Sequence, residues 1–418
     1  IAELNLLLIA IFFMIYKKKN NSILELNWVF LYFVLFYIYI FFNAIFQIND
    51  NLKWTSIGYI RFILLSYFIY FLFKEDLYKS KKNFLILVIF LALIILDAIF
   101  QYFNGKNIIG FKIIGERVSG IFDDELILGS YCLKSFLIIS SLLLINNIDL
   151  KKYKNVLIIF SSLIFFTIYI AAERTSFILL FLTLFLLYFL IKSFRDIIKK
   201  SSFIFILLIL ISSNFNLGQK SNPNGMLIFK TFNQITNYKF AGTTPNKWLN
   251  EEFSNLDFED KIKKLNNTNV HFISDIHSGH YELALYLFKK NKLFGNGPRG
   301  FRKFCRQVEY DSPIGTCTTH PHNYLMQFLS ELGIIGIIFY LFFAIFILVS
   351  FLKVIKIKNN LNNRSIILTL IIGVVINFFP IAPSGDFFSQ LNSFYIFLNF
   401  GMLIFYLEKE KITYVVKI

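Results

Sequence analysis

Long apolar runs alternate with short polar connections along this chain, and a run of about 20 residues at about 1.5 Å per residue crosses about 30 Å of hydrocarbon. Of the eleven apolar runs, the first and the eighth are short. The runs lie at residues 2–16, 25–46, 56–73, 83–102, 126–145, 155–171, 176–194, 202–215, 323–352, 366–382 and 391–407. This pattern predicts an all-α polytopic integral membrane protein with about 11 transmembrane helices.

The composition supports a membrane protein. The 418 residues are 56% hydrophobic and 19% aromatic, with a mean hydropathy of +0.61, which is more apolar surface than one soluble core can bury. A formal charge of +16 would suggest nucleic-acid binding in a soluble domain. Here the lysines form short clusters between apolar runs, which indicates membrane topology instead, and we expect no nucleic-acid partner.

The basic clusters occur at alternate connections, and such connections are cytoplasmic in membrane proteins. They are Lys17–Lys19, Lys74–Lys82, Lys151–Lys154, Lys192–Lys200, Lys353–Arg364 and Lys409–Lys411. The other connections are then external: 47–55, 103–125, 172–175, 216–322 and 383–390. This sidedness places residue 1 outside and the C-terminus inside. We therefore expect one further N-terminal helix, to give twelve spans, and no cleavable signal peptide is evident.

One connection is large enough to form a soluble unit. Residues 216–322 are rich in polar residues and contain all five histidines, His271, His277, His280, His320 and His322. We predict three regions: helices one to eight in residues 1–215, an external loop domain at 216–322, and helices nine to eleven in 323–418.

Two of the three cysteines lie in this external loop, twelve positions apart. Thiols outside the cytoplasmic membrane tend to be oxidised, so we expect a disulfide between Cys305 and Cys317, with two free thiols as the alternative. Cys132, within an apolar run, is expected to be a packing residue. A zinc site formed by His271, His277, His280 and the cysteines would match no common ligand spacing, so we expect no metal and no other cofactor.

Arginines at the external ends of the runs are candidate anion-binding residues, because the guanidinium is always charged and binds phosphate with two hydrogen bonds. Arg117 lies just before the fifth run. Glu173 and Arg174 occupy a hinge between two long runs, where a charged pair must face a cavity or the headgroup layer. The alternative for Arg174 is a snorkelling anchor paired with Glu173.

The sequence suggests more than one role for Arg299 and for Asp97. Arg299 follows Phe294-Gly-Asn-Gly-Pro298, where glycines would let backbone N–H groups approach an anion. Because Arg302, Lys303 and Arg306 follow, a solvated or headgroup-facing surface is the alternative. Asp97, at the external end of the fourth run, would orient an arginine or cap the helix.

The strongest candidate site precedes the ninth run, where His320 and His322 flank Pro321 and Asn323 can act as a helix N-cap. A helix N-terminus favours a nearby anion, and an imidazole can accept a proton near neutral pH. One histidine at a helix start would more often be structural. Two histidines with arginines on separate external segments predict a functional site.

These motifs resemble those of the O-antigen ligase and polymerase family over residues 115–410. His322-Asn323, followed by Gly333 and Gly336, reproduces the family's His-Asn-x9-Gly-x-x-Gly pattern. Arg117-Val-Ser-Gly-Ile-Phe122 is similar to its Arg-x-x-Gly-x-Phe element, and Glu173-Arg-Thr-Ser176 to its helix start. Lys292-Leu-Phe-Gly-Asn-Gly297 is similar to its Pro-Leu-x-Gly-x-Gly turn.

The resemblance implies a metal-independent inverting glycosyltransferase of the GT-C type in the bacterial inner membrane, with its site facing the periplasm. Its implied partners are an undecaprenyl-diphosphate-linked glycan donor, a lipid A-core or carrier-linked glycan acceptor, the lipid bilayer and polysaccharide-assembly membrane proteins. The implied catalytic residues are His322, Arg174 and Arg117. The implied substrate-binding residues are His320, Asn323, His280, Arg299, Glu173 and Asp123.

The chain departs from the family at Ser278-Gly-His280, where many members have Ser-Gly-Arg. His280, Arg299 and Arg302 are then the alternatives for the missing cation. The motifs do not separate ligases from polymerases, and we favour a ligase of lipopolysaccharide biosynthesis. A flippase or transporter of the same lipid-linked glycan would carry its ionisable residues at mid-membrane depth. The external position of the polar residues in this chain favours chemistry there.

Overall fold

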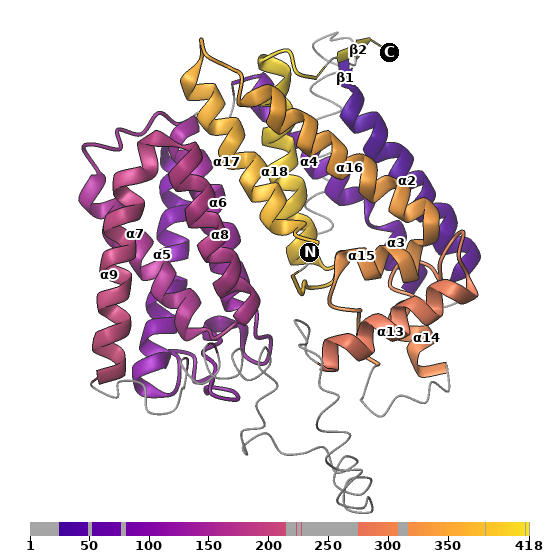
Figure 1. Cartoon of the computed structure of the whole chain (residues 1–418), viewed down its shortest axis with the longest axis horizontal. Coiled ribbons are helices and arrows are strands. Elements are labelled where there is room, and N and C mark those ends of the chain that lie inside the picture. Colours follow the sequence, from indigo (N-terminus) through magenta and orange to yellow (C-terminus); the bar gives the residue numbers. More distant parts are fainter. Residues whose placement is uncertain are drawn as a thin grey trace, which may run out of the picture.

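The computed structural model describes residues 25–48, 52–76, 81–214, 223, 227, 275–307, 317–380, 382–413 and 415–417 (Figure 1). The apolar run at 2–16, His271 and most of the 216–322 loop lie outside the described residues. The first half contains β1 (Glu25–Asn27), α2 (Trp28–Gln47), α3 (Leu52–Ile57), α4 (Ile60–Lys74), α5 (Lys81–Asn104), η1 (Gly120–Phe122), α6 (Leu128–Ile145), α7 (Lys154–Ile170), α8 (Arg174–Leu190), η2 (Lys192–Phe194) and α9 (Arg195–Asn214). The second half contains α13 (Asp275–Lys290), α14 (Phe301–Gln307), α15 (Tyr324–Gln327), η4 (Phe328–Leu332), α16 (Gly333–Val354), α17 (Leu361–Asn377), α18 (Gln390–Lys409) and β2 (Val415–Lys417).

All ten predicted apolar runs within the described residues form helices, but several of these helices are short. By length and composition, five of the described helical segments could cross a membrane, or six if α8 and α9, bent by 114°, form one span. Helices α7, α8 and α17 each have 17 residues, and α4 has 15. At about 1.5 Å per residue these four fall short of about 30 Å of hydrocarbon. The structure therefore confirms helices at these runs, and the count of eleven spans stays a prediction.

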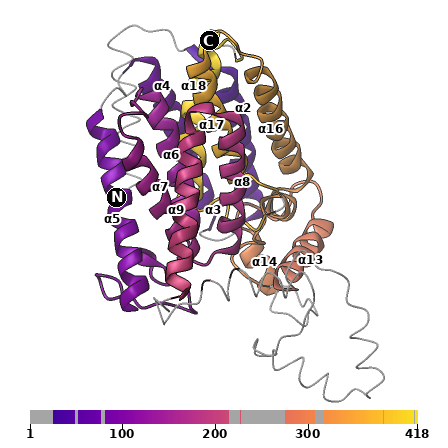
Figure 2. The same cartoon turned by 60° about the vertical axis from the view of Figure 1, so that its left-hand side comes forward.

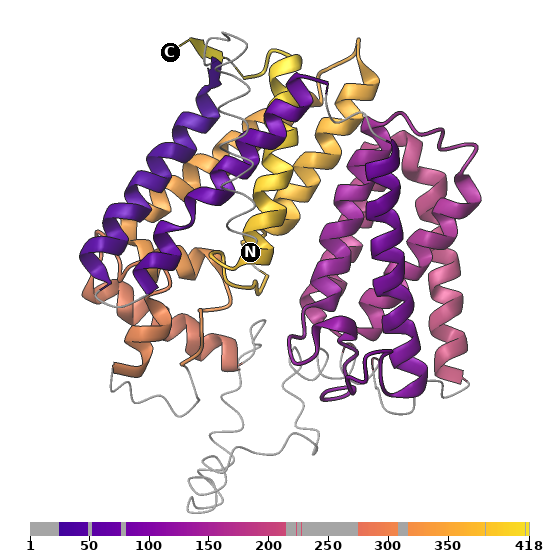
Figure 3. The same cartoon turned by 180° about the vertical axis from the view of Figure 1, so that it is seen from behind.

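The helices form two groups that α17 joins. Helices α5 to α9 stand together on one side, and α2, α4, α16 and α18 stand on the other (Figures 1 and 3). Helix α17 packs against α18 in one group and against α6 and α8 in the other. Its residues Ile366 to Val374 are almost all buried, which is why this 17-residue helix can hold the two groups together.

Helices α13, α14 and α15 lie at one end of the molecule, and β1, β2 and the C-terminus lie at the opposite end (Figures 1 and 2). Side-chain contacts hold the C-terminal end together. The Glu408 carboxylate accepts hydrogen bonds from Asn27 Nδ2 at 2.9 Å and Tyr70 OH at 2.7 Å, and lies 3.6 Å from Lys74 Nζ. The Asn363 amide also donates to Glu410. Three of the predicted cytoplasmic connections, those at 74–82, 353–364 and 409–411, therefore meet at this end.

The ninth apolar run, predicted as one helix, is divided into three pieces. Helix α15 continues into the five-residue π-helix η4, and α16 then begins at Gly333, where φ is +64°. A residue with a Cβ is disfavoured at this φ, so glycine permits the break. The break separates the segment that carries the histidine motif from the long apolar helix.

The strand pair was not predicted. Strands β1 and β2 pair antiparallel, with Leu26 opposite Val416. Each strand has three residues, too few for a period-two pattern to stand out beside the neighbouring apolar helices.

Candidate functional site

Four histidines from two segments lie together at the end of the molecule that contains α13. His277 and His280 lie on α13, and His320 and His322 lie in the loop before α15. The His322 ring centroid is 4.1 Å from that of His320, 5.3 Å from that of His280 and 5.4 Å from that of His277. His322 is therefore the centre of a cluster that brings residues 277 and 322 together.

His320 is bound at both ring nitrogens. Its Nε2 lies 3.2 Å from the Ser384 carbonyl oxygen, and its Nδ1 lies 2.9 Å from Thr319 Oγ1. A carbonyl oxygen only accepts, so Nε2 carries the proton and a neutral ring accepts from Thr319 through Nδ1. Burial lowers the pKa of His320, which favours this neutral form. The buried ring thus anchors the loop.

His322 has a different environment. Within the part of the chain that the structure describes, no hydrogen bond to its half-buried ring is seen. Burial, and then the neighbouring His320, His277 and His280, lower the pKa of His322 to about 3. The ring is therefore neutral near pH 7, and the one ring nitrogen that carries no hydrogen is available to accept a proton.

The backbone of His322 is held in an uncommon conformation. Its φ is +54°, in the left-handed region that residues with a Cβ rarely adopt. Its carbonyl oxygen accepts a hydrogen bond from Ser384 N at 2.8 Å, and Pro321 restricts the preceding backbone. Such strain persists only where neighbouring structure enforces it, and it is common at functional sites.

Asn323 forms the N-cap predicted from the sequence. Its Oδ1 accepts from Met326 N at 3.1 Å, and its Nδ2 donates to the Pro380 carbonyl oxygen at 2.7 Å. The side chain thus caps α15 and binds the loop between α17 and α18. These contacts describe a positioning role.

Arg174 begins α8, on the other group of helices, and its charge reaches the histidines. Burial is the first cause that lowers the pKa of His277 to about 4, followed by the charges of His280, Arg174 and His320. A cation on one group of helices therefore lies near the histidine cluster on the other. Arg174 therefore acts on His277, which lies beside His322, and a joint role of Arg174 and His322 stays a prediction.

Arg117 is close to the same hinge. Its Nε donates to the Ala171 carbonyl oxygen at 3.3 Å, and its Nη2 to that of Leu126 at 3.2 Å. Burial lowers the pKa of Arg117, Glu173 raises it and Arg174 lowers it, so all three charges lie in one region. An arginine stays protonated under such shifts, and Arg117 is a cation at neutral pH.

The loop that carries Arg117 is anchored by two polar residues of α5. Gln101 Oε1 accepts from Ser119 N at 3.1 Å and from Gly120 N at 2.6 Å. Asp97 accepts from Ile108 N at 3.0 Å and from Asn107 Nδ2 at 3.2 Å. Of the alternatives for Asp97, orienting an arginine or capping the helix, the structure shows neither directly, because its carboxylate holds the loop.

Glu173 connects two helices. Its carboxylate accepts from Gly129 N at 2.7 Å, Ser130 N at 3.1 Å and Ser176 Oγ at 2.8 Å. It thereby caps the first turn of α6 while standing before α8. Three protein donors on one carboxylate describe a structural role. Asp123, the other acidic candidate, is exposed and has a φ of +50°.

The backbone directly after the Gly295-Asn-Gly-Pro298 turn binds a carboxyl group of the protein itself. Arg299 N donates to Glu331 Oε2 at 3.0 Å, and Phe301 N donates to Glu331 Oε1 at 3.2 Å. A Cβ at Gly295 would lie 2.4 Å from the Glu331 carbonyl carbon, so glycine lets this turn pack directly on η4. The expected donation of these amides to a substrate is thus replaced by donation to Glu331.

Arg299 is bound within a buried network centred on Asp386. Its Nε lies 3.6 Å from Asp386 Oδ2, and its Nη2 donates to the Phe388 carbonyl oxygen at 2.5 Å. Arg302 Nη2 lies 3.2 Å from the same Asp386 oxygen, and Gln327 Nε2 donates to Asp386 Oδ1 at 2.7 Å. Arg299 and Arg302 both pair with Asp386 and thus stabilise the loop beneath the histidines, and the expected role of Arg299 in substrate binding stays a prediction.

Sequence reasoning missed Asp386, Gln327 and Glu331. Glu331 is fully buried and Gln327 is 1% exposed, although both lie in an otherwise apolar run. A carboxylate in an apolar run is a signal in itself, because burying it requires partners. Gln327, one turn earlier, donates to Glu331 at 2.9 Å, but the other two donors are the amides of Arg299 and Phe301, about 30 residues away, which no local pattern indicates.

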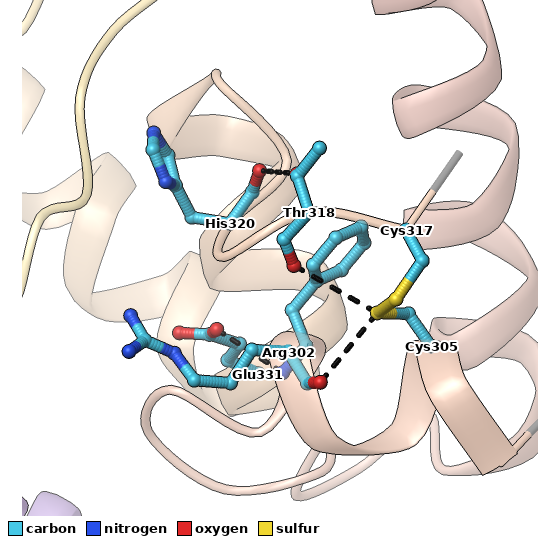
Figure 4. The surroundings of a disulfide bond; sticks show 7 residues. Arg302, Cys305, Cys317, Thr318, His320 and Glu331 are labelled. Atoms are coloured by element: carbon cyan, nitrogen blue, oxygen red, sulfur yellow. Dashed lines mark hydrogen bonds between the residues drawn. A yellow bond between two sulfur atoms is a disulfide. The ribbon is translucent and has the colours of Figure 1, made fainter. Parts of the chain in front are cut away.

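Cys305 and Cys317, the predicted pair, are joined by a disulfide with Cα atoms 5.3 Å apart. Figure 4 shows this bond between α14 and the segment that leads to His320. Cys305 Sγ lies 3.6 Å from the Arg302 carbonyl oxygen and 3.7 Å from that of Thr318. Thr318 Oγ1 donates to the His320 carbonyl oxygen at 2.7 Å, so the disulfide and the histidine loop are directly connected.

No group of three or more His, Cys, Asp or Glu side chains is arranged to hold a metal ion among the described residues. The described histidines instead lie near charged side chains: the Arg174 charge acts on His277, and the charges of Asp386 and Arg302 act on His320.

A model of the family described as O-antigen ligase matches residues 159–341. This segment of the chain is similar to the O-antigen ligase family. No curated protein and no solved structure matches it. The matched segment includes Arg174, the four described histidines and the glycine motifs. Together with the long apolar helices, the match indicates a multi-pass membrane protein. Arg117 and Asp386 lie outside the matched segment.

Proposed function

We propose that this protein is an O-antigen ligase, which transfers a glycan from undecaprenyl diphosphate to a sugar hydroxyl of lipid A-core at the periplasmic face of the inner membrane. The observation that carries this proposal is the position of His322, whose neutral ring lies at the centre of the histidine cluster, next to His277, on which the Arg174 charge acts. A proton acceptor beside a cation is what this transfer needs, because a hydroxyl loses a proton while an anion departs.

In the proposed reaction, the acceptor hydroxyl oxygen attacks the anomeric carbon of the donor sugar and its proton passes to His322. The bond between that carbon and the diphosphate oxygen breaks, and its electron pair leaves with the undecaprenyl diphosphate. Arg174 and Arg117 stabilise the negative charge of this leaving group. Attack opposite the leaving group inverts the configuration at the anomeric carbon, and no step requires a metal.

The distribution of positive charge supports an external site. The basic connections that contain Lys74 and Lys409 meet at the end that carries Glu408, and the histidines lie at the opposite end (Figure 1). By the positive-inside rule, the lysine-rich end is cytoplasmic. A reporter fused after Lys200 should then read cytoplasmic, and one fused at Asn250 periplasmic. A cytoplasmic signal at Asn250 would place the site in the wrong compartment and contradict the proposal.

The decisive experiment is a transfer assay with purified protein, a carrier-linked glycan donor and lipid A-core acceptor, in the presence of a chelator. We expect glycan-bearing lipid A-core and free undecaprenyl diphosphate as products. Extension of the carrier-linked glycan without transfer to lipid A-core would identify a polymerase instead. Activity lost to the chelator and restored by a divalent cation would contradict the metal-independent mechanism.

A further inference from the structure

A lysine lies within the apolar helix α6. Lys134 follows Leu133 and precedes Ser135 and Phe136, all three of which are buried, and α6 is one of the five helices long and apolar enough to cross a membrane. An ammonium group at such a position is costly to insert, and ionisable residues retained there usually serve a function. This lysine is not used in the reaction proposed above.

The partner of Lys134 is neutral. Its Nζ donates a hydrogen bond to Oδ1 of Asn392 on α18. Among the described residues no carboxylate lies within ion-pair distance, and the charge of Glu173, which already binds three protein donors, acts on Lys134 only from farther away. Asn392 in turn donates from Nδ2 to the Asp386 carbonyl oxygen at 2.9 Å. An amide oxygen satisfies one of the three ammonium donors and supplies no counter-charge. The ammonium therefore has the capacity to bind an anion.

Lys134 lies between the two halves of the site. It is four residues, about one helical turn, beyond Ser130, whose amide binds Glu173 at 3.1 Å. Side chains in a helix point towards its N-terminus, so Lys134 extends towards Glu173 and the arginine hinge. Its partner Asn392 belongs to the helix that follows the Asp386 loop. The side chain is half-buried, which leaves part of it accessible.

We propose that Lys134 is a further binding residue for the diphosphate of the lipid carrier, acting with Arg117 and Arg174. This inference rests on the function proposed above. The carrier has its charge directly next to a hydrocarbon chain, so its phosphates are held at the membrane boundary. Lys134 lies six residues, nearly two turns, inside α6, so its ammonium supplies positive charge from the hydrocarbon side, whereas Arg117 lies in a loop and Arg174 at the start of α8. The diphosphate supplies the counter-charge that Asn392 does not.

The alternative role for Lys134 is a purely structural link between α6 and α18. The melting temperature of a Lys134 variant distinguishes this role from carrier binding. Methionine at position 134 removes the charge while keeping the length and apolar character of the side chain. If Lys134 serves binding, Lys134→Met should melt at the same temperature as the wild type or higher, because an uncompensated charge has been removed from an apolar helix. If Lys134 is a link, this variant should melt lower and bind the carrier normally.

The test measures binding of undecaprenyl diphosphate without glycan to the purified full chain in detergent. We expect Lys134→Gln, which can still bond Asn392, to bind at least about tenfold more weakly than the wild type, and Lys134→Arg to lose less. Lys152→Gln, in an exposed connection at the opposite end, is the matched control and should bind normally. Binding by Lys134→Gln within about twofold of the wild type would overturn the inference.

The failure of this inference is distinguishable from failure of the proposed function. A wild-type protein that transfers glycan, together with a Lys134→Gln variant that binds the carrier equally well, contradicts only the role of Lys134. A wild-type protein that binds the carrier diphosphate through Lys134 and transfers no glycan contradicts the proposed reaction.

Discussion

Ser384 binds the histidine loop at two points, since its amide donates to the His322 carbonyl oxygen at 2.8 Å and its carbonyl oxygen accepts from the His320 ring at 3.2 Å. The loop between α17 and α18 therefore fixes the backbone of the proposed base and the ring of its neighbour together. The His322 ring remains available because the anchoring contacts use its backbone and the other histidine.

Replacement of His322 tests the proposed base. His322→Ala should lower transfer by about 100- to 10,000-fold, the usual contribution of a general base, while the melting temperature changes little. Arg174→Lys keeps the charge and loses the two-pronged hydrogen bonding, so it should impair turnover more than His277→Ala does. Turnover is measured with the carrier-linked donor, and near wild-type transfer by His322→Ala would contradict the mechanism.

The histidine cluster predicts a dependence of stability on pH. The folded pKa values are about 3 for His322 and about 4 for His277, both below the ordinary value of 6.5, with burial as the main cause. As pH falls below 6.5, the unfolded chain binds protons first, so the free energy of unfolding decreases until the folded pKa is reached. The melting temperature should fall between about pH 7.5 and pH 5. A His277→Gln and His322→Gln double variant should show a shallower fall, and an unchanged slope would contradict these pKa shifts.

The Asp386 network should be important for stability. Asp386→Asn removes the carboxylate beside Arg299 and Arg302, and breaking a buried ion pair costs about 3–5 kcal/mol. Asp196→Asn is the matched control, because Asp196 pairs with Lys154 in an exposed position, where such pairs contribute about 0–1 kcal/mol. Thermal unfolding in detergent measures both, and equal losses for the two variants would contradict the role assigned to Asp386.

Gly333 tests the close packing of the glycine motifs. An alanine there meets an unfavourable φ of +64° and places its Cβ 2.5 Å from the Leu293 carbonyl oxygen. At Gly115, φ is +53° and nothing lies within 4 Å of the added Cβ. Gly115→Ala should cost about 1–2 kcal/mol from conformation alone. Gly333→Ala should cost about 1–3 kcal/mol more from crowding, and equal unfolding free energies would contradict this packing.

The disulfide should stabilise the loop that contains the proposed base. Opening a bond that closes a loop of this size costs about 2–4 kcal/mol. Reduction, or a Cys305→Ser and Cys317→Ser double variant, should lower the melting temperature and reduce transfer. The double variant should be insensitive to reductant, which controls for the buried Cys132. Mass spectrometry of non-reduced peptides should recover Cys305 linked to Cys317, and two freely alkylated cysteines would exclude the bond.

Much of the fold can be predicted from the sequence because each membrane helix corresponds to a continuous run of apolar residues. Each described apolar run forms a helix, and Asn323 caps α15 as a short polar residue before an apolar run should. Helix lengths are harder to predict. The break at Gly333 depends on contacts with Leu293 and Gly295, forty residues earlier, which local hydropathy does not encode.

The candidate site is predictable only where its chemistry is unusual for its position. Arg174 and His322 stand out because charge and imidazole occur at helix starts. Arg299 looked equally suited to bind substrate, yet it pairs with Asp386, which is 87 positions later and belongs to a different connection. Such pairings arise from the packing of distant segments, so composition and spacing cannot separate a substrate-binding arginine from a structural one.

The two-point attachment to Ser384 also bears on how the segment that matches the family model can be exchanged between proteins. The segment matched to the family model ends at residue 341, before the loop that holds His320 and His322 in place. A chimaera that exchanged only residues 159–341 would place a foreign histidine motif on an unrelated anchor. Grafts intended to change acceptor choice should therefore carry residues 380–392 with them, so that donor and recipient backbones meet just after α17 and inside α18.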